Sequence, residues 1–244
     1  MPSRVQGEEI KLSRVSSSLC LDRPNIIGVF HCQKRKQLEH LIKESTQLFG
    51  IDIIELRIDL LESLPCLQTI VNSPKPFIVT VRHPKEGGNK SLTVEKRLKL
   101  LNASVPLASL VDLELQFWKE LSPILQVARK LCVRIIASFH HFSETPPITE
   151  LLEKANQAKQ CGADVFKVAT YLNSPSDLAC LLQLLDRTAS LLPVAAMGIG
   201  PLGRASRLVL ARCGSILNYG WLIRPMVSGQ WEASKLAKRL KEIA

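Results

Sequence analysis

The sequence of 244 residues contains no apolar run long enough for a membrane-spanning helix, which needs about 20 residues. Its first 23 residues carry charges throughout and have no apolar core like that of a signal peptide. It also has no long glycine-, serine- or proline-rich linker and no shift in composition that would mark a second domain. These absences predict a cytoplasmic protein without membrane contact, with an N-terminal extension over residues 1–23 and one domain over residues 24–244.

Paired cysteines are missing too. The seven cysteines are scattered, odd in number and without a CxxC pair, so we interpret them as small reduced core residues rather than metal ligands or disulfides. They are Cys20, Cys32, Cys66, Cys132, Cys161, Cys180 and Cys213. His31, His40 and His83 each lack a second ligand nearby in sequence. The sequence therefore predicts neither a metal site nor a cofactor.

The charge is unbalanced, with 32 Lys and Arg against 22 Asp and Glu and a formal net charge of +10. Such a balance can attract nucleic acid, but it attracts small anionic metabolites equally well. The basic pairs are dispersed over separate helix-like stretches, and aromatic residues make up only 5% of the chain. Lys96-Arg97 and Lys238-Arg239 are thus interpreted as solvated helix faces, and no nucleic-acid partner is predicted.

Short apolar runs alternate with amphipathic stretches along the chain, which is typical of parallel sheets. Strands are predicted at 25–30, 51–59, 77–82, 110–115, 133–140, 165–170, 194–198 and 216–222. Helices are predicted at 34–49, 91–103, 117–131, 147–161, 176–191, 202–212 and 232–243, with a weaker one at 61–73 that Pro65 interrupts. Eight such units in under 250 residues favour one closed (β/α)8 TIM barrel, an α/β fold, with residues 1–23 as a hairpin or extension under its floor.

Two glycine-rich stretches look like nucleotide-binding loops without fitting them. Gly198, Gly200 and Gly203 have GxGxxG spacing, but they follow the seventh strand and do not open the fold. Gly87-Gly88 follows a strand without the Walker spacing. The first stretch is interpreted as a helix start and the second as a turn that carries Glu86.

Side chains alternate between the two faces of a strand, and in five successive strands the ionisable groups share one face. The residues are Glu55, Arg57, Asp59, Arg82, Asp112, Glu114, His140 and Lys167, with the polar Thr80 and Ser138. An unpaired charge inside a barrel is costly, and barrel enzymes build their active sites at the carboxyl ends of the strands. This face therefore predicts an active site, although a buried ion-pair network that serves packing alone is the other interpretation.

A lysine inside a barrel, beside a histidine, arginines and carboxylates, suits imine chemistry on a carbonyl substrate. The lysine must be neutral to attack, a histidine moves protons near neutral pH, and arginines bind carboxylates or hydroxyls. Asp112 and Glu114 are expected to support the lysine and the arginines rather than to react. The pattern predicts proton abstraction next to a carbonyl, assisted by an imine.

At these residues the sequence resembles the type I 3-dehydroquinate dehydratases of the shikimate pathway. The matching stretches, in family order, are ELRID at 55–59, TVRHPKEGG at 80–88, SFHHF at 138–142, GADVFK at 162–167, SRL at 206–208 and SGQW at 228–231. The resemblance implies that Lys167 forms a Schiff base with 3-dehydroquinate and that His140, oriented by Glu86, transfers the protons of a syn elimination of water. It implies that Arg207 binds the substrate carboxylate.

The resemblance further assigns substrate-binding residues. Ring hydroxyls are expected to meet Glu55, Arg57 and Arg82, and Gln230 is expected to close over the substrate on the last loop. Tyr219 and Met197 are expected as apolar walls. The family's Ser-Ala-Pro-Gly-Gln pattern reads Met-Val-Ser-Gly-Gln at 226–230, so the usual serine is displaced or absent, and Ser228 is the residue expected to substitute for it. His141 lies on the helix-facing side, which leaves proton transfer to His140 alone.

Two other functions remain open from the sequence. Another Schiff-base barrel lyase, such as a keto-acid aldolase, would share the lysine but would not need a histidine paired with Glu86. A catalytically silent barrel that binds anions would form no imine. The resemblance also leaves open a homodimer and a fusion to, or partnership with, shikimate dehydrogenase, but the chain has no convincing dinucleotide-binding fingerprint.

Overall fold

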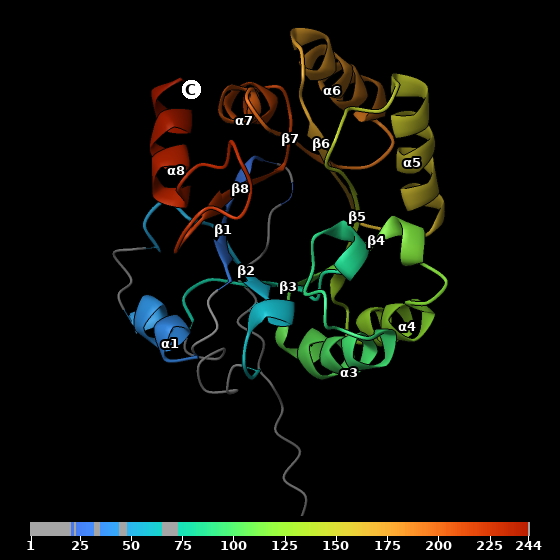
Figure 1. Ribbon diagram of the computed structural model, residues 1–244, viewed down its shortest axis with the longest axis vertical. Coiled ribbons are helices and arrows are strands. Elements are labelled where there is room, and N and C mark those ends of the chain that lie inside the picture. The colour runs from blue at the N-terminus through green and yellow to red at the C-terminus, as the bar shows by residue number, and fades with distance from the viewer. Residues whose placement is uncertain (1–20, 22, 32–34, 44–47, 65–72, 244) are drawn as a thin grey trace, which may run out of the picture.

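Parallel strands and helices alternate along the chain in the computed structural model, which describes residues 21, 23–31, 35–43, 48–64 and 73–243 (Figure 1). The strands are β1 (Asn25–Phe30), β2 (Ile53–Arg57), β3 (Phe77–Thr80), β4 (Leu110–Glu114), β5 (Arg134–His141), β6 (Val165–Tyr171), β7 (Val194–Ile199) and β8 (Leu217–Trp221). They form one sheet in the order β7-β6-β5-β4-β3-β2-β1-β8. The predicted α/β barrel architecture is confirmed.

The first and last strands of that order also meet. The backbone N–H of Ile216 donates to the carbonyl oxygen of Val194 at 3.0 Å. The hydroxyl of Ser215 bonds both the N–H of Ala196, at 3.0 Å, and its carbonyl oxygen, at 3.1 Å. These bonds link β7 to the residues directly before β8 and bring the two ends of the sheet together.

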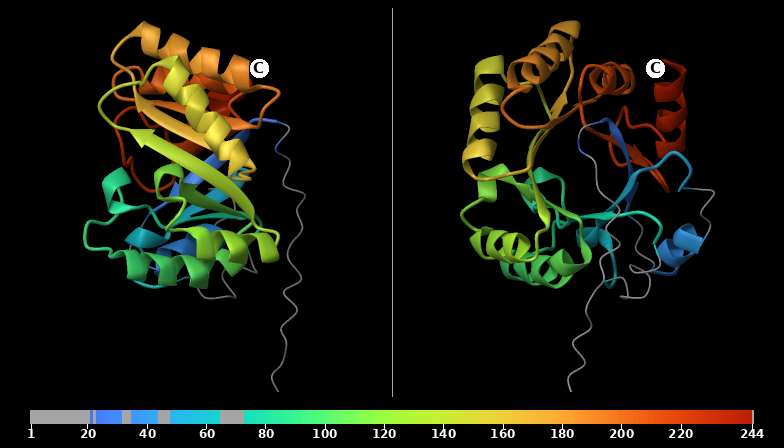
Figure 2. Two further views of the ribbon diagram at one scale, coloured as in Figure 1. Left: turned by 90° about the vertical axis from the view of Figure 1, so that its right-hand side faces the viewer. Right: turned by 180° about the vertical axis from the view of Figure 1, so that it is seen from behind.

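Helices surround the sheet on its outer side, as the three views agree (Figure 2). They are α1 (Arg35–Lys43), α3 (Val94–Ser104), α4 (Ser122–Lys130), α5 (Ile148–Gln160), α6 (Pro175–Thr188), α7 (Gly203–Arg212) and α8 (Ala233–Glu242). Capping side chains define the starts of two helices: Thr93 caps α3, and Ser174 with Asp177 forms a capping box at the start of α6, where Pro175 is the first residue. Short 3₁₀ turns follow β2, β3 and β4.

Two apolar layers follow from the alternation of side chains. Leu56, Val79 and Phe166 belong to the layer between strands and helices, whereas Ile53, Ile78 and Val165 belong to the inner layer of the barrel. These assignments agree with the parity predicted from the sequence. The inner layer fills the barrel with apolar side chains, so polar groups collect where the strands end.

Two predictions about burial were wrong. Cys132 and Cys213 are exposed rather than in the core, because both lie in turns after helices, outside the apolar face. Arg97 is fully buried in α3, not solvated, although its neighbour Lys96 is exposed. Its guanidinium is accommodated because it donates to the carbonyl oxygen of Val81 and pairs with Glu114.

Other predictions fall largely outside the described residues. The N-terminal extension does so apart from Leu21 and Arg23, as do residues 65–72 of the weak helix prediction, while residues 61–64 are not helical. In the described part of the chain, no helix combines the length and apolarity needed to cross a bilayer.

Candidate active site

A cavity of about 220 Å³ lies where the strands end, and it is lined by nearly all of the residues predicted for the site. The predicted residues that line it are Glu55, Arg57, Arg82, Glu86, His140, Lys167, Met197, Arg207, Tyr219 and Gln230. They come from positions 55 to 230 of the chain, and the barrel brings them together because all of its strands are parallel.

Lys167 lies on β6 and is 4% exposed. Its Nζ atom donates to Oδ2 of Asp112 at 2.7 Å and lies 3.5 Å from Oε1 of Glu55. It also lies 3.9 Å from the centre of the Tyr219 ring, in the geometry of a cation–π contact. The amine is therefore held in place by two carboxylates and one aromatic face at the edge of the cavity.

Arg82 connects this lysine to the next layer of charges. Its guanidinium donates to Asp112 at 2.8 Å, to Glu114 at 3.1 Å and to the hydroxyl of Ser138 at 2.7 Å. Burial opposes the charge on Asp112, but Arg82 and Lys167 outweigh it and hold the pKa of its carboxyl below its usual range. Asp112 and Glu114 thus support Arg82 and Lys167, the arrangement expected from the sequence.

His140 and Glu86 form a pair that also lines the cavity. Nδ1 of His140 lies 2.7 Å from Oε2 of Glu86, and the amide of Gln116 donates to the other oxygen of Glu86. Burial raises the pKa of Glu86 to about 7, while burial together with Arg82 and Lys167 lowers the pKa of His140 well below its usual value. Near neutral pH the imidazole is therefore neutral, and whenever Glu86 is ionised it accepts the Nδ1 proton and leaves Nε2 unprotonated.

Arg207 differs from the other cationic groups in the cavity. It is buried in α7, and its Nη1 donates to the backbone oxygen of Tyr219 at 2.9 Å. Its Nε atom is buried and has no hydrogen-bond partner among the described residues. Burial lowers the pKa of Arg207 to about 10. A buried guanidinium without a carboxylate is suited to an anion that enters the cavity.

Arg57 and the last loop form the remaining side of the cavity. Arg57 holds Asp59 through two hydrogen bonds, of 2.9 and 2.8 Å, and also donates to the sulfur of Met226 at 3.4 Å. The side-chain oxygen of Gln230 accepts from the backbone N–H of Met226 at 2.9 Å, which closes the loop on itself. The loop thus contacts the strand residues that line the site.

Ser228 is the predicted site residue that the structure does not bring to the cavity. It is exposed, and it is its backbone oxygen that accepts from Gly200, at 3.3 Å. His31 and His83 are buried and His40 is exposed, and the described residues contain no cluster of metal-binding side chains. The contact of Ser228 with substrate remains a prediction that this geometry does not support.

Several contributors were not identified from the sequence. Gln116, which donates to Glu86, lies in the 3₁₀ turn after β4 and beyond the predicted strand, so strand parity could not place it. Phe142 lines the cavity with its ring stacked on His140 at a centroid distance of 6.1 Å. Val29, Ala169 and Ile199 also line it, but an apolar strand residue carries no sequence signal that distinguishes a wall from the core.

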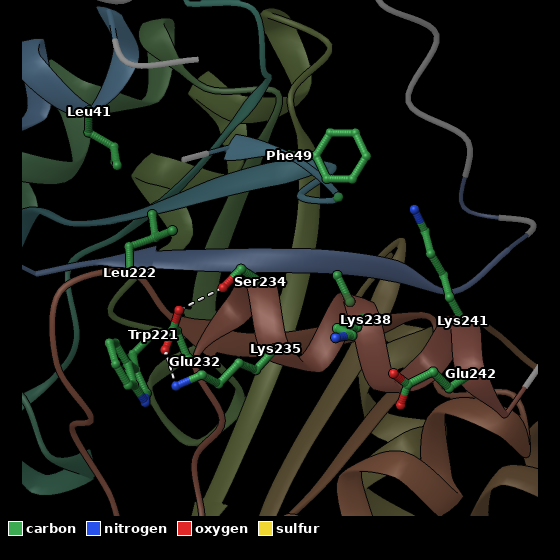
Figure 3. A pocket seen from close by; sticks show the side chains of 12 residues that line it. Leu41, Phe49, Trp221, Leu222, Glu232, Ser234, Lys235, Lys238, Lys241 and Glu242 are labelled. Atoms are coloured by element: carbon green, nitrogen blue, oxygen red, sulfur yellow. Dashed lines mark hydrogen bonds and ion pairs between the residues drawn. The ribbon is translucent and has the colours of Figure 1, made fainter. Parts of the chain in front are cut away.

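A larger cavity of about 810 Å³ lies beside α8, away from this site (Figure 3). Leu41, Phe49 and Leu222 line it, and Lys235, Lys238 and Lys241 of α8 stand along it. Its carboxylates already form exposed ion pairs, Glu232 with Lys235 and Glu242 with Arg239. It has neither a buried lysine nor a histidine, so its size does not make it the active site.

Comparison with known proteins agrees with this geometry. The family described as type I 3-dehydroquinase matches residues 30–244. A 3-dehydroquinate dehydratase of Thermodesulfovibrio yellowstonii is 30% identical over 216 residues, covering 84% of this chain and 91% of that protein. The crystal structure of 3-dehydroquinate dehydratase from Geobacillus kaustophilus superposes with a TM-score of 0.82 at 24% identity, covering 91% of each chain.

A second solved structure gives the same result. The type I 3-dehydroquinate dehydratase of Clostridium difficile, solved with covalently modified comenic acid, has a TM-score of 0.79 at 25% identity and covers 91% of this chain and 92% of its own. The family match, the relative and the fold all converge on one assignment: this chain belongs to the type I 3-dehydroquinase family, the enzymes that dehydrate 3-dehydroquinate.

Proposed function

We propose that this chain converts 3-dehydroquinate to 3-dehydroshikimate and water by a syn elimination, through a Schiff base on Lys167. One observation carries the proposal: a buried lysine, a histidine–carboxylate pair and an arginine without a carboxylate partner among the described residues line one cavity of about 220 Å³. These groups are what an imine, a proton transfer and a carboxylate clamp each require.

The reaction begins at the substrate ketone. Once neutral, the Nζ atom of Lys167 attacks the carbonyl carbon, and the resulting carbinolamine loses water to give a protonated imine. This imine draws electrons from the neighbouring carbon, so that Nε2 of His140 can remove a proton from it and leave an enamine. The enamine expels the hydroxyl as His140 returns the proton to it, and water then hydrolyses the imine, which frees Lys167 and the product.

Substrate binding divides among the other groups. Arg207 holds the substrate carboxylate, because a buried guanidinium gains a charge-assisted hydrogen bond from an incoming anion. Glu55, Arg57 and Arg82 meet the ring hydroxyls, Tyr219 and Met197 form walls, and Gln230 limits the entry of water from the last loop. We retain Ser228 only as a contact that would require the loop to move.

The paired histidine supports this function over the aldolase that shares its lysine chemistry. An elimination needs a group that removes one proton and delivers one to the departing hydroxyl, and His140 with Glu86 suits that task. A catalytically inactive barrel that only binds anions would not require a buried lysine on the cavity wall. Likeness to aldolases at 14 to 15% identity concerns the fold alone.

The test is borohydride reduction in the presence of 3-dehydroquinate, followed by peptide mass spectrometry. The expected result is a ligand-derived adduct on Lys167, with 3-dehydroshikimate released in the unreduced sample. Lys167→Ala should give no adduct and no product, whereas His140→Ala should still give the adduct but eliminate slowly. An active Lys167→Ala protein would contradict the proposed mechanism.

A further inference from the structure

The protonated amine of Lys167 has three N–H donors, and the structure provides three acceptors around it. They are a carboxylate oxygen of Asp112 at 2.7 Å, one of Glu55 at 3.5 Å and the face of the Tyr219 ring at 3.9 Å. Before substrate enters, the cation thus has a hydrogen bond to Asp112, an ion pair with Glu55 and a cation–π contact with Tyr219. When the ammonium becomes an imine, the number of N–H donors available to these acceptors must therefore change.

Imine formation, on which this inference rests, removes donors from that set. A protonated imine keeps its positive charge but has a single N–H, so two of the three acceptors lose their donor. Asp112 keeps two other hydrogen-bond donors, because Arg82 donates to it at 2.8 Å and Ser138 at 2.6 Å. Among the described residues, Glu55 retains one donor, the hydroxyl of Thr80 at 2.7 Å. A buried carboxylate that loses a donor is costly, and the two oxygens of Glu55 can accept a further donor besides Thr80 and the ring hydroxyl that Glu55 is proposed to meet.

Tyr219 carries a donor that is not in use. Its side chain is buried, and its Oη atom has no hydrogen-bond partner among the described residues. Burial raises the pKa of Tyr219 well above its usual value, and the negative charges of Glu55 and Asp112 raise it further. The phenol therefore remains protonated, and its ring and the Glu55 carboxylate flank the same nitrogen atom.

We propose that Tyr219 is a positioning residue for the imine: its ring holds the ammonium of Lys167, and its hydroxyl donates to Glu55 once that ammonium becomes an imine. An unused donor in the free enzyme becomes a hydrogen bond in the intermediate, which stabilises the intermediate relative to the free enzyme. Tyr219 also accepts the bond from Arg207 through its backbone oxygen, so the same residue contacts the lysine and the carboxylate clamp.

Tyr219→Phe isolates the hydroxyl because the ring remains. A hydrogen bond to a charged group corresponds to about a tenfold or larger effect on an equilibrium. We expect kcat, and the rate of borohydride trapping on Lys167, to fall about tenfold or more, with KM within about threefold of wild type. The thermal midpoint of the ligand-free variant should equal or exceed that of the wild type, because the lost hydroxyl had no partner there.

Two further variants complete the test. Tyr219→Leu removes ring and hydroxyl and should trap more slowly than Tyr219→Phe. Tyr171→Phe makes the same chemical change at the chain's other tyrosine, which is not among the residues lining the cavity, and should keep kcat within about twofold.

The possible outcomes distinguish a failure of the role of Tyr219 from a failure of the Schiff-base mechanism. Wild-type trapping on Lys167 with normal kcat in Tyr219→Phe would overturn the role of the hydroxyl alone. A lower thermal midpoint in ligand-free Tyr219→Phe would also overturn it, because the hydroxyl would then have a structural partner. If the wild type gave no adduct on Lys167, the Schiff base itself would fail and this inference with it.

Discussion

Nδ1 of His140 lies 2.7 Å from Oε2 of Glu86, so the carboxylate sets which nitrogen of the imidazole is available for proton transfer. When Glu86 is ionised, it accepts the Nδ1–H and leaves Nε2 unprotonated. When Glu86 is protonated, it donates to Nδ1 instead, and the neutral ring then carries its proton on Nε2, which cannot act as a base. The titration of the pair therefore connects the geometry to the dependence of the rate on pH.

The first prediction concerns the acid limb of kcat/KM. Because burial raises the pKa of Glu86 to about 7, kcat/KM of the wild type should rise with pH to a plateau, with a midpoint near pH 7. In Glu86→Gln the midpoint should move below 6.5, because burial and neighbouring cations lower the pKa of His140. The plateau should fall about 100-fold, as expected when an acid–base residue loses its orienting group. An unchanged midpoint in Glu86→Gln would show that another group controls the limb.

The same carboxyl predicts how stability changes with pH. Its pKa is about 7 in the folded protein against 4.5 for an ordinary glutamate, so the folded state binds more protons between those values. The contribution of Glu86 to the free energy of unfolding is thus full below about pH 4.5 and declines as pH rises to about 7. Urea unfolding of wild type and Glu86→Gln at pH 5 and pH 7.5 should show a larger decline in the wild type. Equal declines would place the raised pKa in doubt.

Arg207 predicts a loss of affinity without a loss of stability. Arg207→Met removes a buried cation that has no carboxylate partner among the described residues, so the free energy of unfolding should hold or rise. The KM for 3-dehydroquinate should rise about 10- to 100-fold, the effect of one hydrogen bond to a charged group. Arg212→Met, at the exposed end of the same helix, is the matched control and should change neither quantity. Normal KM in Arg207→Met would remove the carboxylate clamp.

For Arg97 we expect a loss of stability. Its fully buried guanidinium pairs with Glu114 and donates to the carbonyl oxygen of Val81 at 2.9 Å, and Arg97 is not among the residues that line the cavity. Arg97→Met should lower the free energy of unfolding by about 3 kcal/mol, because Glu114 keeps Arg82 but loses its second cation. Lys96→Met, one position away and exposed, should change it by less than about 0.5 kcal/mol. Urea unfolding that gave both variants the same midpoint would refute this assignment.

Much of the fold and the polar end of the barrel could be predicted, because strands repeat with a period of two. Glu55, Arg82 and Lys167 share a face by parity alone, and parallel strands must bring such faces together. The partners within the site could not be predicted in this way. Whether Asp112 or Glu55 lies nearer to Lys167 depends on the register between strands, which no local pattern encodes.

The contacts of Arg97 and the orientation of Ser228 could not be predicted from local sequence either. Arg97 lies on an amphipathic helix and was predicted to be solvated, because its buried partner Glu114 is distant in sequence. Ser228 was placed by resemblance, but the backbone of its loop turns the side chain outward. The contact of the last loop with Gly200 and Gly203 could not be predicted either, because Gly229 is distant from both in sequence.

Gly229 allows that packing, because its φ is +79° and an added Cβ would lie 2.7 Å from the oxygen of Gly200 and 2.8 Å from the Cα of Gly203. Gly229→Ala should therefore displace the loop that carries Gln230 and raise the KM for 3-dehydroquinate about tenfold or more, since the loop would no longer close the site. Gly214→Ala is the matched control: its φ is +107° with open space around the added Cβ, so it should lower the free energy of unfolding by about 1 kcal/mol and leave KM unchanged. If both variants lost stability alike and neither changed KM, the contact between Gly229 and Gly203 would have no part in substrate binding.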